Sequence, residues 1–433
     1  MNLKLKNPKS MVYVYISFVF ALFAVSGQLI SYILPNAIFK FIVVASVLLL
    51  LLSKMRNIRI PKSEVVPVVL LFVMGILVFY NDDWWNIYDI SIYCATLLLC
   101  LFSFINGKWI SYYFKFSIVA YFIYALFTIF TYLNPDFYIN NVVVLFPNSR
   151  NRLLTWYNQG CMAGLTDHYS TNAMFLSVGL TILVCYIISI KNKRKKMGKY
   201  YFALLVILVA LLLTGKRGQI VFSFIALFAV YYISLKSKGT VKRFIKIIGF
   251  IIVFLGLFFI AWQLFPELFV FMERFTQSID NDNLTSNRSK LLWPLAINAF
   301  KSSPIFGLGW CQYTSTISTQ IIGESSNYHA HNIYLQLLCD TGIFGFGIYV
   351  AWILINLIST YKIYNKVLGN SVIDSKIKFY IAFSLAFQIY FIFYGLTGNP
   401  LYDEEMFIPY YVSCAISIYY RNNYDLILSN NNC

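Results

Sequence analysis

Charged residues are scarce in this sequence. They make up 12% of its 433 residues, whereas hydrophobic residues make up 59%; a soluble domain carries about 25% charged residues. With a mean hydropathy of +0.68, this composition argues against a soluble globular fold. The eight cysteines include no CxxC pair and no Cys/His cluster, so neither a zinc site nor a disulfide scaffold is indicated. Internal repeats and low-complexity linkers are also missing.

Long apolar runs separated by polar breaks fill the chain instead. About 20 apolar residues suffice to cross a bilayer as a helix, so the pattern predicts an all-α, polytopic membrane protein with about 12 transmembrane helices. The first run is too long for a cleavable signal peptide, and no small-residue cleavage site follows it. The predicted spans lie near 12–34, 38–53, 65–80, 87–105, 112–133, 169–190, 200–214, 219–235, 247–265, 333–360, 379–397 and 406–420.

The distribution of basic residues predicts the orientation of these spans. With the N-terminus in the cytoplasm, 25 of the 34 Lys and Arg residues fall on the cytoplasmic side and nine fall outside, which is the asymmetry that membrane proteins show. Both termini are therefore predicted to be cytoplasmic. The runs KNKRKK (191–196) and KSKGTVKRFIK (236–246) then lie beside lipid headgroups. The net charge of +17 thus indicates anchoring to membrane lipids and no nucleic-acid partner.

A single integral membrane domain over 1–433 is predicted, with two long outward segments at 134–168 and 266–332. The second of these is the large extracytoplasmic loop, for which we expect short helices. Residues 286–309 place apolar residues at helical spacing before a Pro/Gly break, which predicts an amphipathic helix. All three histidines lie on or near the outward segments: His168, His329 and His331.

Two adjacent basic residues stand on the outer side, against the charge distribution of the rest of the chain. Lys216 and Arg217 lie in the short turn TGKRGQ (214–219) between two apolar spans. A cation held near hydrocarbon costs about 2.5–3.5 kcal/mol. Either the two side chains reach to lipid headgroups, or they form an anion site. Flanking Gly215 and Gly218 favour the anion site, because they let backbone N–H groups approach a phosphate, which a guanidinium also binds bidentately.

His331 lies where the large outward segment becomes an apolar span, in NYHAHNIYLQLLCDTGIFGFGIYV (327–350). Imidazole titrates near neutrality and can act as a general base or acid. From the residues alone, an interface histidine without a chemical role is equally consistent. Gly342, Gly345 and Gly347 suit close helix packing.

This segment resembles the signature of the O-antigen polymerase/O-antigen ligase superfamily of bacterial membrane glycosyltransferases. That pattern is His, then Asn, Ser or Gln, nine residues, Gly, two residues, and then Gly, Thr or Tyr. The chain has His331-Asn332, nine residues, Gly342, two residues and Gly345. Upstream, 287–310 resembles the Arg-containing stretch and the PxxGxG close of the same loop, and TGKRG (214–218) resembles an Arg-bearing turn of the family. The resemblance covers roughly 200–360 by motif and the whole chain by topology.

The resemblance implies roles for individual residues. His331 is implied as the catalytic residue, and Arg217 and Arg288 as the groups that bind a lipid pyrophosphate. His329 ranks below His331, because the spacing to Gly342 selects His331. The candidate substrate-binding residues are Arg217, Arg288, Lys216, His329, Asn332 and Arg152, and Tyr313 and Tyr334 are further candidates for the sugar site.

Arg152 belongs to the first outward segment, together with Arg150, Asp167 and His168. This segment is either a solvated loop or a region that recognises the acceptor or the donor. Asn172, just inside the next span, is a candidate for lining the same cavity.

The implied reaction is glycosyl transfer from an undecaprenyl-pyrophosphate-linked oligosaccharide donor to a sugar hydroxyl of the acceptor, at the outer face of the bacterial inner membrane. Direct attack at C1 implies inversion. An Asp-rich metal motif is missing beside these groups in the sequence, so we expect a metal-independent reaction without a cofactor. A chain-length regulator and a flippase are implied as partners.

Three functions are consistent with these residues. A polymerase would join repeat units into O-antigen, capsular or exopolysaccharide chains, and a ligase would transfer the finished chain to lipid A-core. The Tyr-, Phe-, Ile-, Asn- and Lys-rich composition is similar to that of divergent polymerases, which favours polymerase. A flippase would show half-repeats and charged or broken helices near the midplane, and the sequence indicates neither.

Overall fold

The computed structural model describes residues 107–190, 197–235, 288–314 and 329–431, with isolated residues among 11–19 and 239–256. Within these residues the secondary structure is helical, without strands. The predicted spans near 38–53, 65–80 and 87–105 lie outside the described residues, as do most residues of those near 12–34 and 247–265.

Five of the described helices are long and apolar enough to cross a membrane. They are α5 (Lys108–Leu133), α8 (Tyr169–Ser189), α10 (Arg217–Ser234), α15 (Ile333–Leu368) and α16 (Ser375–Tyr394). Two further helices, α9 (Gly198–Leu213) and α17 (Glu404–Asn422), occupy predicted spans. The prediction of an all-helical membrane protein is confirmed by these helices; the count of 12 spans stays a prediction, since much of the chain lies outside the described residues.

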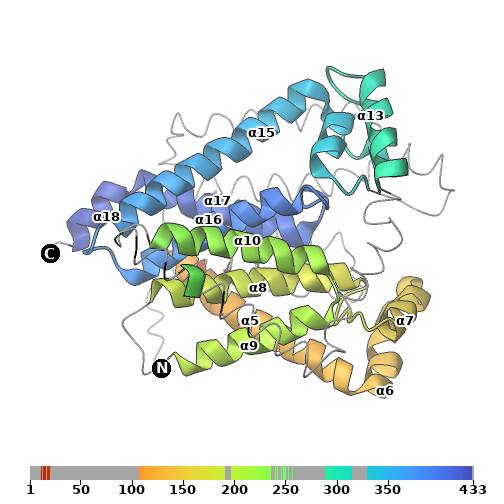
Figure 1. The fold of residues 1–433 in the computed structure, drawn as a ribbon, viewed down its shortest axis with the longest axis horizontal. Helices are drawn as coiled ribbons and strands as arrows, with labels where there is room; N and C mark the ends of the chain where they lie inside the picture. The colour runs from red at the N-terminus through yellow and green to blue at the C-terminus, as the bar shows by residue number, and fades with distance from the viewer. Residues whose placement is uncertain are drawn as a thin grey trace.

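The centre of the bundle consists of α8 and α16. Of their most apolar stretches, 78% and 72% of residues are buried, against 22% in α10 and 33% in α5. α16 packs against α8, α10, α15 and α17, and α5 packs against α8 and α9 (Figure 1). The outer helices expose large apolar side chains such as Ile123, Leu205 and Ile358. These surfaces suit contact with lipid, which is as apolar as the side chains themselves.

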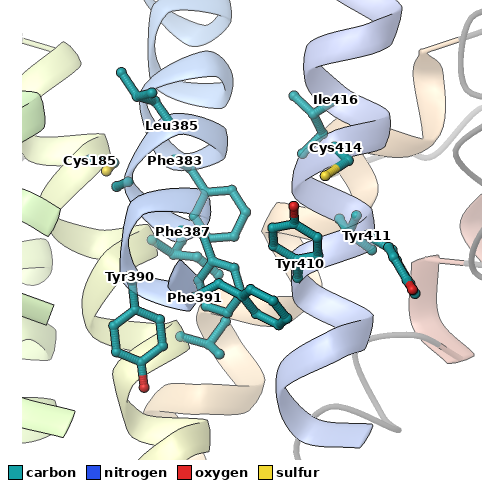
Figure 2. Packing of buried hydrophobic residues seen from close by; sticks show 14 of the residues in the cluster. Cys185, Phe383, Leu385, Phe387, Tyr390, Phe391, Tyr410, Tyr411, Cys414 and Ile416 are labelled. Atoms are coloured by element: carbon teal, nitrogen blue, oxygen red, sulfur yellow. The ribbon is translucent and has the colours of Figure 1, made fainter. Parts of the chain in front are cut away.

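Aromatic side chains fill the contact between α16 and α17. Phe391 stacks on Tyr410 with ring centroids 3.9 Å apart, and Trp352 of α15 meets Tyr410 edge-on at 5.6 Å. Figure 2 shows Phe383, Phe387 and Phe391 of α16 turned toward the α17 side chains. Such pairs contribute about 0.5–1.5 kcal/mol beyond area burial, so the two helices form a rigid support for the connection between them.

Short helices gather at one end of the bundle. They are α6 (Pro135–Phe137) and α7 (Arg150–Asn158) in the first outward segment, and α13 (Trp293–Ser302) in the second. In Figure 1 they lie at the right, with the start of α15, whereas α18 (Tyr424–Asn431) lies at the opposite end. The expected amphipathic helix is confirmed as α13, which buries Ala296 and Ala299. The segment 134–168, expected as a loop, contains short helices as well.

Candidate functional site

The site is built where five chain segments meet at the end of the bundle that carries α7 and α13. These are the start of α8 at His168, the α9–α10 turn at Lys216, the single π-helical turn Arg288–Leu292, residues 329–332 before α15, and the α16–α17 connection 395–403. Hydrogen bonds join them: Ile333 N–H donates to Gly395 O (2.9 Å), and Met162 N–H donates to Leu213 O (2.9 Å). Residues up to 235 positions apart in the chain thus meet at this end of the bundle.

The backbone at His331 is held in an uncommon conformation. Its φ is 51°, in the left-handed region that non-glycine residues enter at a cost of about 1–3 kcal/mol. Both neighbours are fixed: Ala330 N–H donates to the Gln336 Oε1 (3.1 Å), and Asn332 caps the following helix. A rigid turn therefore holds the half-buried imidazole in one orientation. A reacting group needs such a fixed position.

Asn332 has a structural role that the sequence did not indicate. Its Oδ1 accepts hydrogen bonds from the N–H groups of Tyr334 (3.0 Å) and Leu335 (3.2 Å), which makes it the N-cap of α15. Because Oδ1 is used in the cap, the predicted contact of Asn332 with substrate would be made by its Nδ2 group. The Tyr334 hydroxyl donates to Ile392 O (2.9 Å), which ties the start of α15 to α16, and its role in a sugar site stays a prediction.

The spacing between His331 and the glycine motif is explained by a break in α15. Gly342 has φ 62° and ψ −170°, so the helix has a first leg of nine residues, 333–341, and then changes direction. The PxxGxG stretch 304–309 runs along this break: Leu308 N–H donates to Cys339 O (2.9 Å) and Ile343 N–H to Pro304 O (2.9 Å). A Cβ on Gly342 would collide with the carbonyl of Ile305. The two motifs are therefore one interlocked unit.

Arg288 and Lys216 approach His331 from different segments. Arg288 donates from Nη1 to Thr397 O (3.1 Å). Lys216 is the N-cap of α10, and its Nζ lies 5.3 Å from the ring centroid of Tyr169. Burial and the charges of Arg288, Lys216, His329 and His168 lower the pKa of His331 to about 3. The imidazole is therefore neutral at physiological pH and sits in a strongly positive field.

The pKa values of the two cations are lowered as well, chiefly by burial. Burial, and next the charge of Arg288, lower the pKa of Lys216 to about 8, against the raising effect of Asp403. Burial also lowers the pKa of the Arg288 guanidinium. Two partly buried cations therefore lie close together at the N-terminus of α10, an arrangement that favours an anion such as a phosphate.

The other predicted residues lie around this centre. Burial lowers the pKa of His329, whose Nδ1 lies 3.2 Å from the Gln336 Nε2. Arg217 is the first residue of α10, and its charge acts on Lys216. Arg152 is exposed on α7, and its charge acts on His168. Lys216, Arg288, His329 and His331 are brought together, Arg217 adjoins them, and Arg152 lies farther out. The substrate roles of all these residues stay predictions.

Sequence reasoning missed the α16–α17 connection. Thr397 supplies the carbonyl that accepts from Arg288. Burial raises the pKa of Asp403 to about 7, and the charge of nearby Lys216 opposes this shift. Asn399 is 3% exposed, and within the described residues its carboxamide atoms have no hydrogen-bond partner. The signal was the polar stretch TGNPLYDEE (397–405), which alternation of the spans places on the same side as His331.

Comparison with known proteins agrees with the motifs. Residues 202–350 match the protein family described as O-antigen ligase. The matched stretch, about a third of the chain, contains the α9–α10 turn, Arg288 and the segment from His331 to Gly345. It confirms the resemblance to the O-antigen polymerase/ligase superfamily. No curated protein matches the chain. Residues 202–350 are thus similar to the O-antigen ligase family, and the described chain has five helices long and apolar enough to cross a membrane.

Proposed function

We propose that the chain is a polysaccharide polymerase that transfers a growing saccharide from undecaprenyl pyrophosphate to a hydroxyl of the next lipid-linked repeat unit. The observation that carries this proposal is the convergence of neutral His331 with Lys216 and Arg288 at one end of the bundle. A base beside two cations is what transfer from a pyrophosphate leaving group needs. We place this end at the outer face of the inner membrane, with both termini in the cytoplasm.

The proposed step is a direct displacement at C1 of the donor sugar, with inversion. The acceptor oxygen forms the new bond to C1, and the electron pair of the breaking C1–O bond stays on the pyrophosphate. The acceptor hydroxyl passes its proton to a nitrogen of His331. Lys216 and Arg288 stabilise the departing pyrophosphate, with about 1.5–3 kcal/mol for each charge-assisted hydrogen bond. Arg217 assists at the same anion.

The donor itself makes His331 a stronger base in this scheme. In the free protein, burial and the cations hold the pKa of His331 at about 3. A bound pyrophosphate brings negative charge to the same cations and offsets their repulsion of a proton. The pKa of His331 therefore rises when the donor binds, so that proton transfer becomes favourable once the reaction is set up.

A ligase is the alternative, and the description of the matched family favours it. The two activities use the same donor chemistry and differ in the acceptor. Deletion of the gene separates them on surface-glycan gels: a single repeat unit on the surface acceptor identifies a polymerase, whereas full-length chains left on the carrier lipid identify a ligase. A flippase is less consistent, because translocation needs no base.

The variant His331→Ala tests the chemistry itself. We expect the protein to insert normally and polymer formation to stop. Full polymer formation by this variant would contradict the role of His331 as the base. Binding of undecaprenyl pyrophosphate to the purified variant is the control, since Lys216 and Arg288 remain.

A further inference from the structure

An aromatic cluster adjoins the cations of the site on the side of the first outward segment. The ring centroid of Trp156, on α7, lies 4.3 Å from that of His168 and 5.1 Å from that of Tyr169. His168 and Tyr169 stack at 4.7 Å with an interplanar angle of 20°. All three side chains are half-buried, so each ring is supported on one side and accessible on another.

The cluster is joined to the cation site through Tyr169. The Lys216 Nζ lies 5.3 Å from the Tyr169 ring centroid, within the range of a cation–π contact. The backbone fixes this neighbourhood, because Met162 N–H donates to Leu213 O and the Cys161 Sγ occupies the space beside Gly215 in the α9–α10 turn. The rings are therefore positioned against the same turn that carries Lys216.

His168 gives the cluster a hydrogen-bond donor. Its Nδ1 accepts from Ser170 N–H (2.9 Å) at the start of α8, and burial, with the charges of Lys216 and Arg152, lowers its pKa to about 3. A neutral imidazole that accepts at Nδ1 carries its proton on Nε2. The surface thus combines aromatic faces with fixed polar donors.

We propose that Trp156, His168 and Tyr169 form a saccharide subsite that holds a sugar residue of the substrate beside the cation site. Aromatic faces pack against the C–H surfaces of a pyranose ring, while imidazole and ammonium groups bind its hydroxyls; ligand sites commonly combine these features. The inference rests on the proposed function, since it assigns the saccharide part of the same substrate. The contrasting role for Trp156 is to anchor α7 at the membrane interface.

The test uses the purified full-length protein and two probes. One probe is the free oligosaccharide released by mild acid from the lipid-linked repeat units of the source cell, and the other is undecaprenyl pyrophosphate without sugar. We expect Trp156→Leu to weaken oligosaccharide binding at least tenfold and to change undecaprenyl pyrophosphate binding less than twofold. Trp156→Phe, which keeps a ring, should bind the oligosaccharide within threefold of the parent protein.

Phe137→Leu is the matched control, because Phe137 is an exposed aromatic residue of α6 in the same outward segment. It should bind both probes as the parent protein does, and melting temperatures check that every variant is folded. Parent-like oligosaccharide binding by Trp156→Leu would overturn the subsite, and so would an equal loss in Phe137→Leu. Failure of the parent protein to bind free oligosaccharide would overturn it as well. Polymer formation by His331→Ala would defeat the proposed function while leaving oligosaccharide binding at Trp156 intact.

Discussion

The imidazole of His331 is held neutral by its surroundings. Burial removes water from the ring, and Arg288, Lys216, His329 and His168 add positive charge. Both effects disfavour the imidazolium ion. In the free protein this residue is a weak base, and a bound anion is the change that strengthens it.

The pH dependence of the reaction separates the free and the donor-bound states. The acid limb of kcat/KM reports ionisation in the free protein, and that of kcat reports the bound complex. Because protonated His331 cannot accept a proton, activity falls as pH drops through its pKa. We expect the limb in kcat to lie at higher pH than that in kcat/KM. Coincident limbs in a steady-state assay with lipid-linked donor would contradict the proposed coupling.

Asp403 is expected to keep Lys216 charged. Its carboxylate raises the pKa of Lys216, which burial and then Arg288 lower to about 8. In Asp403→Asn this support is lost and Lys216 deprotonates at lower pH. The alkaline limb of kcat/KM should therefore move to lower pH, with a several-fold loss of activity at pH 8. Adding Lys216→Arg should restore the limb, since arginine stays protonated; an unchanged limb in Asp403→Asn would exclude this role.

At the scale of elements, the break in α15 and the PxxGxG stretch position the site together. The first leg of α15 carries the His331 turn at its start, and the stretch 304–309 locks its end. Gly307 has φ 76°, and a Cβ there would lie 2.5 Å from the carbonyl of Asp340. Asp340 in turn accepts from Tyr313 N–H (3.0 Å) and from the Tyr402 hydroxyl (2.5 Å). This network ties the large outward segment to α15 and to the α16–α17 connection.

Gly342→Ala tests whether this unit is required. The new Cβ would meet the Ile305 carbonyl, and alanine is disfavoured at φ 62°. We expect a loss of about 1–3 kcal/mol or more in stability, seen as a lower melting temperature in detergent. Gly347→Ala is the control: nothing lies within 4 Å of its Cβ position in the same helix, and alanine there favours helix by up to about 1 kcal/mol. Equal melting temperatures for the two variants would contradict the interlock.

The sequence predicted the seven described span helices and α13 closely, because apolar length and helical spacing are written directly in the residues. It did not predict the break in α15, because Gly342, Gly345 and Gly347 were assigned to close helix packing within one continuous span. Asn332 was assigned to substrate from its place beside His331 in the motif, and the sequence did not indicate that its carboxamide caps α15. Local patterns thus predict elements, whereas packing between segments decides where an element bends.

At the scale of the whole molecule, the charge distribution and the fold agree. Lys362, Lys366, Lys376 and Lys378 lie at the α15–α16 junction, opposite the end where His331 lies. Lys216, Arg288 and His331 lie together at one end of the bundle, as expected for residues that are predicted on the same side of the membrane. Asp403 was overlooked because acidic residues carry little weight in topology, although alternation of the spans places it on the same predicted side as the cations. What the sequence could not supply was the distance between segments that follow different spans.

This two-sided arrangement predicts the accessibility of introduced cysteines in cells. Arg150 is exposed on α7 at the end that carries the site, and Asp425 is exposed on α18 at the other end. In spheroplasts, a membrane-impermeant maleimide should label Arg150→Cys directly and Asp425→Cys only after permeabilisation. The parent chain, with its eight native cysteines, gives the background. The reverse pattern would place Lys216, Arg288 and His331 on the cytoplasmic side. The basic runs 191–196 and 236–246 would then lie outside, against the charge asymmetry of membrane proteins. The proposed outer site would then be wrong.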